Sequence, residues 1–80
     1  MSKAEKLLLR MLTKPNDFNY SELKTVMRIF GYIEMQGSGS RVCFRKNAHN
    51  IKLHKPHPGN ILKKYQLDLV IEELKKQGLI

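Results

Sequence analysis

The chain has 80 residues and a formal net charge of +8, from 15 lysines and arginines against seven aspartates and glutamates. Its hydrophobic fraction of 41% excludes a disordered chain, and its length excludes a second domain, so we expect one domain over residues 1–80. A single cysteine excludes an internal disulfide and favours a reducing cytoplasm, and no apolar run reaches the roughly 20 residues that cross a bilayer.

Two amphipathic helices are predicted in the first part of the chain. Apolar residues at positions 4, 7, 8 and 11 recur with helical spacing and predict a first helix that ends before a turn at residues 14–17. Asn19 followed by Glu22 is a capping-box pattern, and Phe18 and Leu23 stand at the positions of a hydrophobic staple. The second helix should therefore begin at Asn19 and end at Gly31.

After Gly31 the apolar residues recur with a period of two, which is typical of strands. Strands are predicted at residues 32–35, 40–46 and 49–54, joined by turns at 36–39 and 47–48. Two prolines interrupt residues 55–59, and a last helix is predicted over residues 65–77. The expected fold is α+β in the order ααβββα, with helices on one face of a three-stranded antiparallel sheet.

The positive charge is concentrated in residues 35–67, which contain seven lysines and arginines, all three histidines and no acid. Alternation along the strands predicts one apolar face and one basic face, the latter with Arg41, Cys43, Arg45, Lys52 and His54. Such a continuous positive field attracts polyanions, and RNA is the ligand we expect. The alternative is a solvated surface that net charge keeps soluble.

Two short segments carry candidate site residues. The turn at residues 37–41 offers backbone amides and the hydroxyls of Ser38 and Ser40 to phosphate oxygens beside Arg41, or it is only a glycine-rich hairpin turn. Further along, His54 and His57 are three residues apart, and an ordinary imidazole exchanges protons near pH ~6.5. Attack of an RNA 2′-hydroxyl on the adjacent phosphorus needs such groups. The alternative is a structural role for both histidines.

A metal site or another cofactor is not expected. Cys43, His49, His54 and His57 are potential ligands, but their spacing matches no compact zinc pattern and the surrounding cations repel a divalent ion. We expect Cys43 to fill space rather than to act as a nucleophile.

These segments, in this order and spacing, resemble the HicA family of toxins from toxin-antitoxin systems. The resemblance rests on Phe30-Gly31-Tyr32, on residues 39–44 (GSRVCF), on residues 54–58 (HKPHP), and on a last helix that ends at residues 77–80 (QGLI). It covers residues 18–80, so that residues 1–17 would be an added helix and turn. The resemblance implies a double-stranded-RNA-binding-like fold, metal-independent mRNA endonuclease activity and a HicB-like antitoxin as partner.

One position departs from the family pattern. The catalytic histidine of the family follows the Gly-Ser pair, and this chain has Arg41 there. An arginine stays charged at neutral pH and is no ordinary general base, but it can bind phosphate or stabilise developing charge. We therefore expect His54 and Arg41 to be catalytic and the RNA contacts to be Ser38, Ser40, Arg41, Arg45, Lys52, Lys55 and His57. The alternatives are an RNA-binding module without turnover and a protein-interaction domain with an acidic partner.

Overall fold

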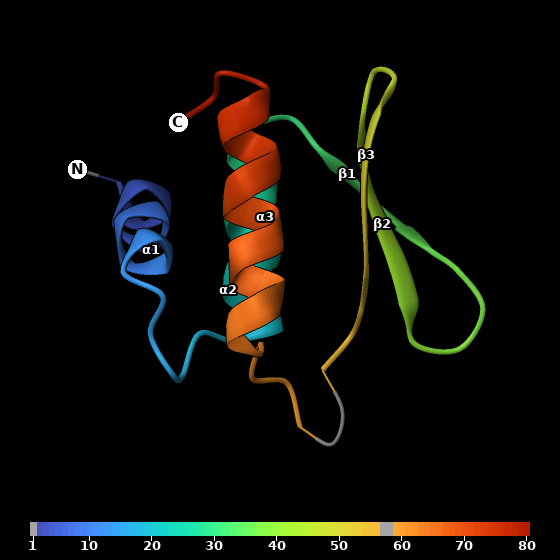
Figure 1. The fold of residues 1–80 in the computed structure, drawn as a ribbon, viewed down its shortest axis with the longest axis horizontal. Coiled ribbons are helices and arrows are strands. Elements are labelled where there is room, and N and C mark those ends of the chain that lie inside the picture. The colour runs from blue at the N-terminus through green and yellow to red at the C-terminus, as the bar shows by residue number, and fades with distance from the viewer. Residues whose placement is uncertain (1, 57–58) are drawn as a thin grey trace.

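Three helices and three strands follow the predicted order ααβββα in a computed structural model that describes residues 2–56 and 59–80. The helices are α1 (Lys3–Leu12), α2 (Tyr20–Ile29) and α3 (Lys64–Lys76), and the strands are β1 (Ile33–Gln36), β2 (Arg41–Lys46) and β3 (His49–His54) (Figure 1). The predicted α+β class is confirmed. No helix within the described ranges is long and apolar enough to span a bilayer.

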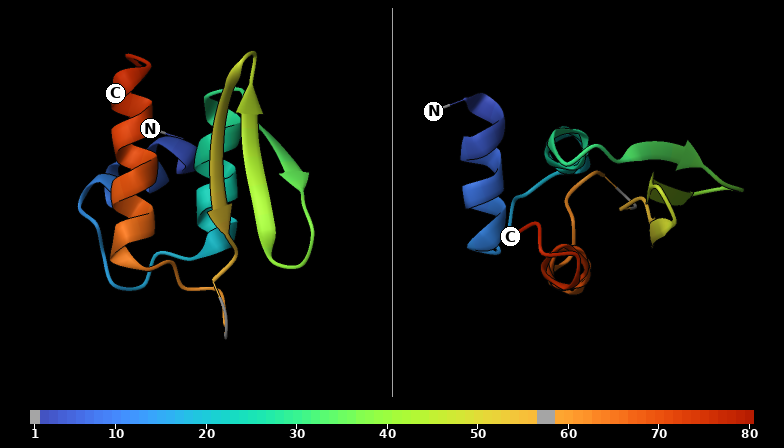
Figure 2. Two further views of the ribbon diagram at one scale, coloured as in Figure 1. Left: turned by 45° about the vertical axis from the view of Figure 1, so that its right-hand side comes forward. Right: turned by 90° about the horizontal axis from the view of Figure 1, so that it is seen from above.

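The elements form three layers. The sheet lies on one side, α2 and α3 lie next to each other in the middle, and α1 lies behind them on the far side (Figure 2). The strands pair antiparallel in the order β1-β2-β3. The inward side chains of β2 and β3 are at most 6% exposed: Val42, Phe44, Ile51 and Leu53. Because helices cover only this face, the opposite face of the sheet is open to solvent.

The first strand begins one residue later than the sequence predicted. Gly31 has a φ of +85°, its N–H donates to the Arg28 carbonyl at 3.0 Å, and the Tyr32 N–H donates to the Met27 carbonyl at 3.0 Å. These are the two bonds of a Schellman helix end. The backbone of Tyr32 thus ends α2, and strand pairing starts at Ile33.

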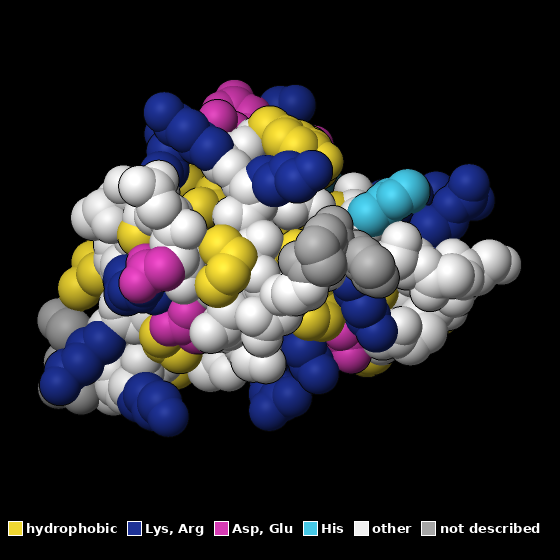
Figure 3. All heavy atoms as spheres, turned by 90° about the horizontal axis from the view of Figure 1, so that it is seen from below, with side chains coloured by type: hydrophobic (Ala, Val, Ile, Leu, Met, Phe, Trp, Pro, Cys, Tyr) yellow, Lys and Arg dark blue, Asp and Glu magenta, His cyan; other side chains and the backbone are white. Residues whose placement is uncertain are grey.

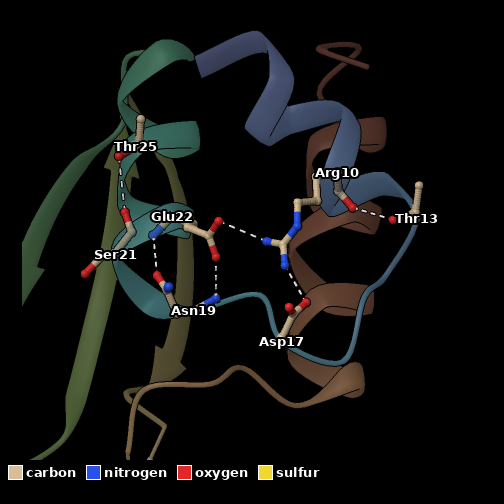
Figure 4. Close-up of polar contacts among 7 residues, drawn as sticks. All are labelled: Arg10, Thr13, Asp17, Asn19, Ser21, Glu22 and Thr25. Atoms are coloured by element: carbon tan, nitrogen blue, oxygen red, sulfur yellow. Dashed lines mark hydrogen bonds and ion pairs between the residues drawn. The ribbon is translucent and has the colours of Figure 1, made fainter. Parts of the chain in front are cut away.

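The predicted capping box at the start of α2 is present and also anchors α1. The Glu22 N–H donates to Asn19 Oδ1 at 2.8 Å, and the Asn19 N–H donates to Glu22 Oε1 at 3.0 Å. Arg10 of α1 donates to the second carboxylate oxygen of Glu22 at 2.9 Å and also pairs with Asp17 (Figure 4). One glutamate therefore starts α2 and holds α1 against it.

Substitution of Glu22 separates these two roles. Glu22→Ala removes both and should lower the free energy of unfolding by about 1–2 kcal/mol. Glu22→Gln keeps an oxygen for the Asn19 N–H and loses only the charge beside Arg10, so its cost should stay below about 1 kcal/mol. Urea unfolding followed by circular dichroism measures both values. Equal losses in the two variants would contradict the role of the capping box.

Candidate nucleic-acid interface

The open face of the sheet, here called the outer face, carries the predicted basic residues. The alternation of the strands places on it Ile33, Met35, Arg41, Cys43, Arg45, Asn50, Lys52 and His54. Arg41, Arg45, Lys52 and His54 are all exposed, and Cys43 is half-buried among them. None of these outer-face residues is acidic. The predicted grouping of Arg41, Arg45, Lys52 and His54 on one exposed face is confirmed.

The register of β2 and β3 sets Arg41 directly opposite His54. The Lys55 N–H donates to the Ser40 carbonyl at 2.7 Å, which makes Ser40 and Lys55 a hydrogen-bonded pair. Hydrogen-bonded and non-hydrogen-bonded pairs alternate along antiparallel strands, so Arg41 and His54 form a non-hydrogen-bonded pair. Their Cα atoms are therefore about 4.5 Å apart, and both side chains project to the same side.

Lys52 lies in the next such pair along the strands, opposite Cys43. Arg45 follows opposite Asn50, about 13 Å from Arg41 at ~3.3 Å per residue. In the view from below, a histidine lies against a Lys or Arg side chain on the side of the molecule that the sheet forms (Figure 3). The cations of the outer face therefore lie in a row along β2 and β3 and are not gathered at one position.

A depression of about 590 Å³ runs along this row. Its lining includes Met35, Gly37, Arg41, Arg45, Lys52 and His54. The volume is within the range of about 300–1,000 Å³ that is typical of ligand sites. The depression therefore has room for a nucleotide-sized group between cations from β2 and β3.

The turn before β2 holds Arg41 by its backbone. The Gly37 N–H donates to the Arg41 carbonyl at 2.8 Å, and the Arg41 N–H donates to the Ser38 carbonyl at 3.2 Å. A Cβ atom at Gly37 would lie 3.2 Å from the Arg41 Cβ, which is a tight contact. Ser38 and Ser40 are exposed, and their carbonyl oxygens accept hydrogen bonds, that of Ser38 from Arg41 and that of Ser40 from Lys55. Gly39 has a φ of +62°, so the turn contains a glycine at a positive φ, as expected of a glycine-rich hairpin turn.

Lys55, one of the predicted RNA contacts, is not brought to the outer face. Lys55 is half-buried, and its Nζ lies 5.9 Å from the centroid of the Tyr20 ring. Tyr20 donates to Glu34, which also pairs with Lys24 at 3.7 Å, so Lys55 belongs to a cluster on the helix side of the sheet. Burial, and then the contact with Glu34, raises the pKa of the Tyr20 hydroxyl. His57, another predicted RNA contact, lies outside the described residues.

Gln66 of α3 supports His54, and the sequence prediction missed it. Its side chain is 4% exposed, its Nε2 donates to the His54 carbonyl at 2.8 Å, and its Oε1 accepts from the Lys63 N–H at 3.0 Å. One amide therefore starts α3 and fixes the end of β3 that carries His54. A buried glutamine three residues after a helix start is a capping pattern, but its partner in β3 is distant in sequence.

His49 differs from His54 because its ring faces the helices. Tyr32 Oη lies 2.7 Å from His49 Nδ1, and His49 Nε2 lies 3.0 Å from Glu73 Oε2. The hydrogen bond from His49 lowers the pKa of the Glu73 carboxyl. Burial, and then the charge of Glu73, raises the pKa of the Tyr32 hydroxyl. Both ring nitrogens of His49 are thus engaged in joining β3 to α3 and to the end of α2.

Within residues 2–56 and 59–80, no three His, Cys, Asp or Glu side chains come together as a metal site would require.

No family model matches the sequence, and no curated protein and no solved structure matches it either.

Replacement of Gln66 by leucine should lower the free energy of unfolding by about 1–3 kcal/mol, because the Lys63 N–H and the His54 carbonyl lose their partner. Gln77→Leu, at the exposed end of the same helix, is the matched control and should stay within about 0.5 kcal/mol of the parent protein. Urea unfolding compares the two variants. A loss in Gln66→Leu no larger than in the control would contradict the bridging role.

The Glu73 contact should make stability depend on pH in the acidic range. The pKa of Glu73 is lower in the folded than in the unfolded chain, so its contribution is complete above the ordinary carboxyl pKa and is lost as the pH falls through the folded value. Glu73→Gln should therefore lower the melting temperature more at pH 7 than at pH 3. Glu72→Gln removes an exposed neighbouring charge and serves as the control. A pH-independent difference for Glu73→Gln would contradict this coupling.

Proposed function

We propose that the protein binds RNA through the outer face of its sheet. The observation that carries the proposal is the row formed by Arg41, Lys52 and Arg45, which shares its face with His54 and with no carboxylate. Cations in a row neutralise successive phosphates and release counterions, which is the main source of affinity for nucleic acids. The outer face has no Phe, Tyr or Trp, so contacts to phosphate and sugar should dominate over base stacking.

We further propose that it is a HicA-like toxin that cleaves mRNA without a metal ion. The order of the family motifs supports this, and so does the pairing of Arg41 with His54 at one end of the row. In the reaction, His54 accepts the proton of an RNA 2′-hydroxyl, whose oxygen forms a bond to the adjacent phosphorus. The bond from phosphorus to the 5′-oxygen breaks, and this oxygen takes a proton from water. Arg41 stabilises the negative charge that develops on the phosphoryl oxygens.

The second candidate function is RNA binding without turnover. Arg41 stands where the family has its catalytic histidine, and His54 is the one histidine on the outer face within the described part of the chain. A single imidazole can accept the proton of the 2′-hydroxyl or donate one to the leaving oxygen, but it does not supply both the base and the acid in one step. In either case, a HicB-like antitoxin with an acidic surface is the proposed protein partner, and the cytoplasm is the proposed compartment.

Substitutions on the outer face should weaken RNA binding in a salt-dependent way. Arg41→Ala and Lys52→Ala should each lower the affinity for a short single-stranded RNA, and each should reduce the steepness of log K against log salt by about 0.7. Lys6→Ala, on α1 behind the helices, is the matched control and should bind as the parent protein does. Fluorescence anisotropy at several salt concentrations measures these effects. Equal losses in all three variants would overturn the assignment of the face.

The same variants distinguish cleavage from binding. A catalytic His54 predicts that His54→Ala binds RNA but loses cleavage by about 10²–10⁴-fold. The products from the parent protein should carry a 2′,3′-cyclic phosphate and a 5′-hydroxyl, which gel mobility and end-labelling detect. RNA that stays intact with highly purified parent protein, together with salt-dependent binding, would instead establish the second candidate.

A further inference from the structure

The two edges of the sheet are protected to different degrees. On β3, Gln66 donates to the carbonyl of His54 that points away from β2, and the exposed Lys52 lies within the strand. Edge lysines and covering side chains are common means of preventing a strand from pairing with another chain. β1 has neither lysine nor proline, and its Ile33 and Met35 are 68% and 46% exposed. The edge of β1 is therefore open to another strand.

The backbone of β1 is suited to pair with a second copy of itself. The Gly37 N–H donates to the Arg41 carbonyl, and the alternation of pairs then directs the backbone groups of Glu34 and Gln36 away from β2. In the described part of the chain, neither residue exchanges a backbone hydrogen bond with a segment outside the sheet. An antiparallel copy with Glu34 opposite Gln36 would satisfy the outward groups of both residues on both strands.

We propose that two copies of this protein associate through their β1 edges in this register, about a twofold axis beside Met35. Met35 then faces Met35 of the second copy in a non-hydrogen-bonded pair, where side chains are closest. The register with Glu34 opposite Glu34 places like charges across from each other and is disfavoured.

The distribution of charge selects this edge for a second copy. Each chain carries a net charge of +8, so two copies repel each other wherever their cations meet. The outer-face cations lie on β2 and β3, and β1 has none. Salt at about 0.15 M screens charges beyond ~8 Å, so the cations on β2 add little repulsion across a β1 seam.

Association would also complete the depression on the outer face. The register places Ile33 of the second copy opposite Gly37, which borders Arg41 in the depression. The second copy would therefore add an apolar side chain beside the β1 side of the depression. The two outer faces would lie on the same side of one continuous sheet, with a cationic row on each side of the Met35 seam.

Disulfide trapping tests both association and register. In a Cys43→Ser background, Met35→Cys places two thiols in a directly opposed pair, whose Cα separation of about 4.5 Å permits a disulfide. Ile33→Cys is the matched control, because it lies on the same strand and face but would be about 13 Å from its counterpart. Under mild oxidation, the Met35→Cys dimer should form at least about tenfold faster than the Ile33→Cys dimer. Equal rates would overturn the register.

Equilibrium measurements test the association itself. Sedimentation should show a concentration-dependent dimer that strengthens with salt, which is opposite to RNA binding, and Met35→Lys should weaken it on the order of tenfold. Leu9→Lys on the exposed surface of α1 is the control and should leave it unchanged. A free protein that remains monomeric at about 1 mM would overturn the proposal. Protection of the β1 amides from hydrogen exchange that arises only on addition of a different protein would also overturn the proposal.

Discussion

A shift of one residue in the pairing of β3 with β2 would move every side chain of β3 to the opposite face of the sheet. The observed register avoids this because Val42 and Phe44 must lie beside Leu53 and Ile51 to enter the core. The same register necessarily turns the intervening positions outward. Arg41, Lys52 and His54 therefore come together as a consequence of core packing, and this constraint produces the candidate site.

Contacts from α3 fix the sheet at two points along β3. Near one end, Gln66 binds the carbonyl of His54; at the other end, Glu73 binds the ring of His49. Both contacts come from one rigid helix, so the position of β3 is defined over its length. His54 and His49 are equivalent in chemistry but not in placement, since one faces solvent and the other is engaged at both ring nitrogens.

The fold tolerates a large net charge because none of the lysines and arginines that the structure describes is buried in the core. Several acidic groups on the helix side have cationic partners: Glu22 pairs with Arg10, and Asp68 pairs with Lys14. The outer face has no such compensation, so the cations there are available to an external anion. Uncompensated charge on an open face, rather than the total of +8, is what gives the polyanion proposal its physical basis.

The sequence by itself determined the element order, the capping box at Asn19 and the two faces of the sheet. These features depend on local spacing and on alternation, both of which can be read along the chain. Only the tertiary structure decided that Lys55 lies over the ring of Tyr20 and that Gln66 binds the end of β3. It also decided that His49 joins Tyr32 to Glu73. These contacts join residues far apart in sequence, and they depend on how helices pack against the sheet, which no local pattern encodes.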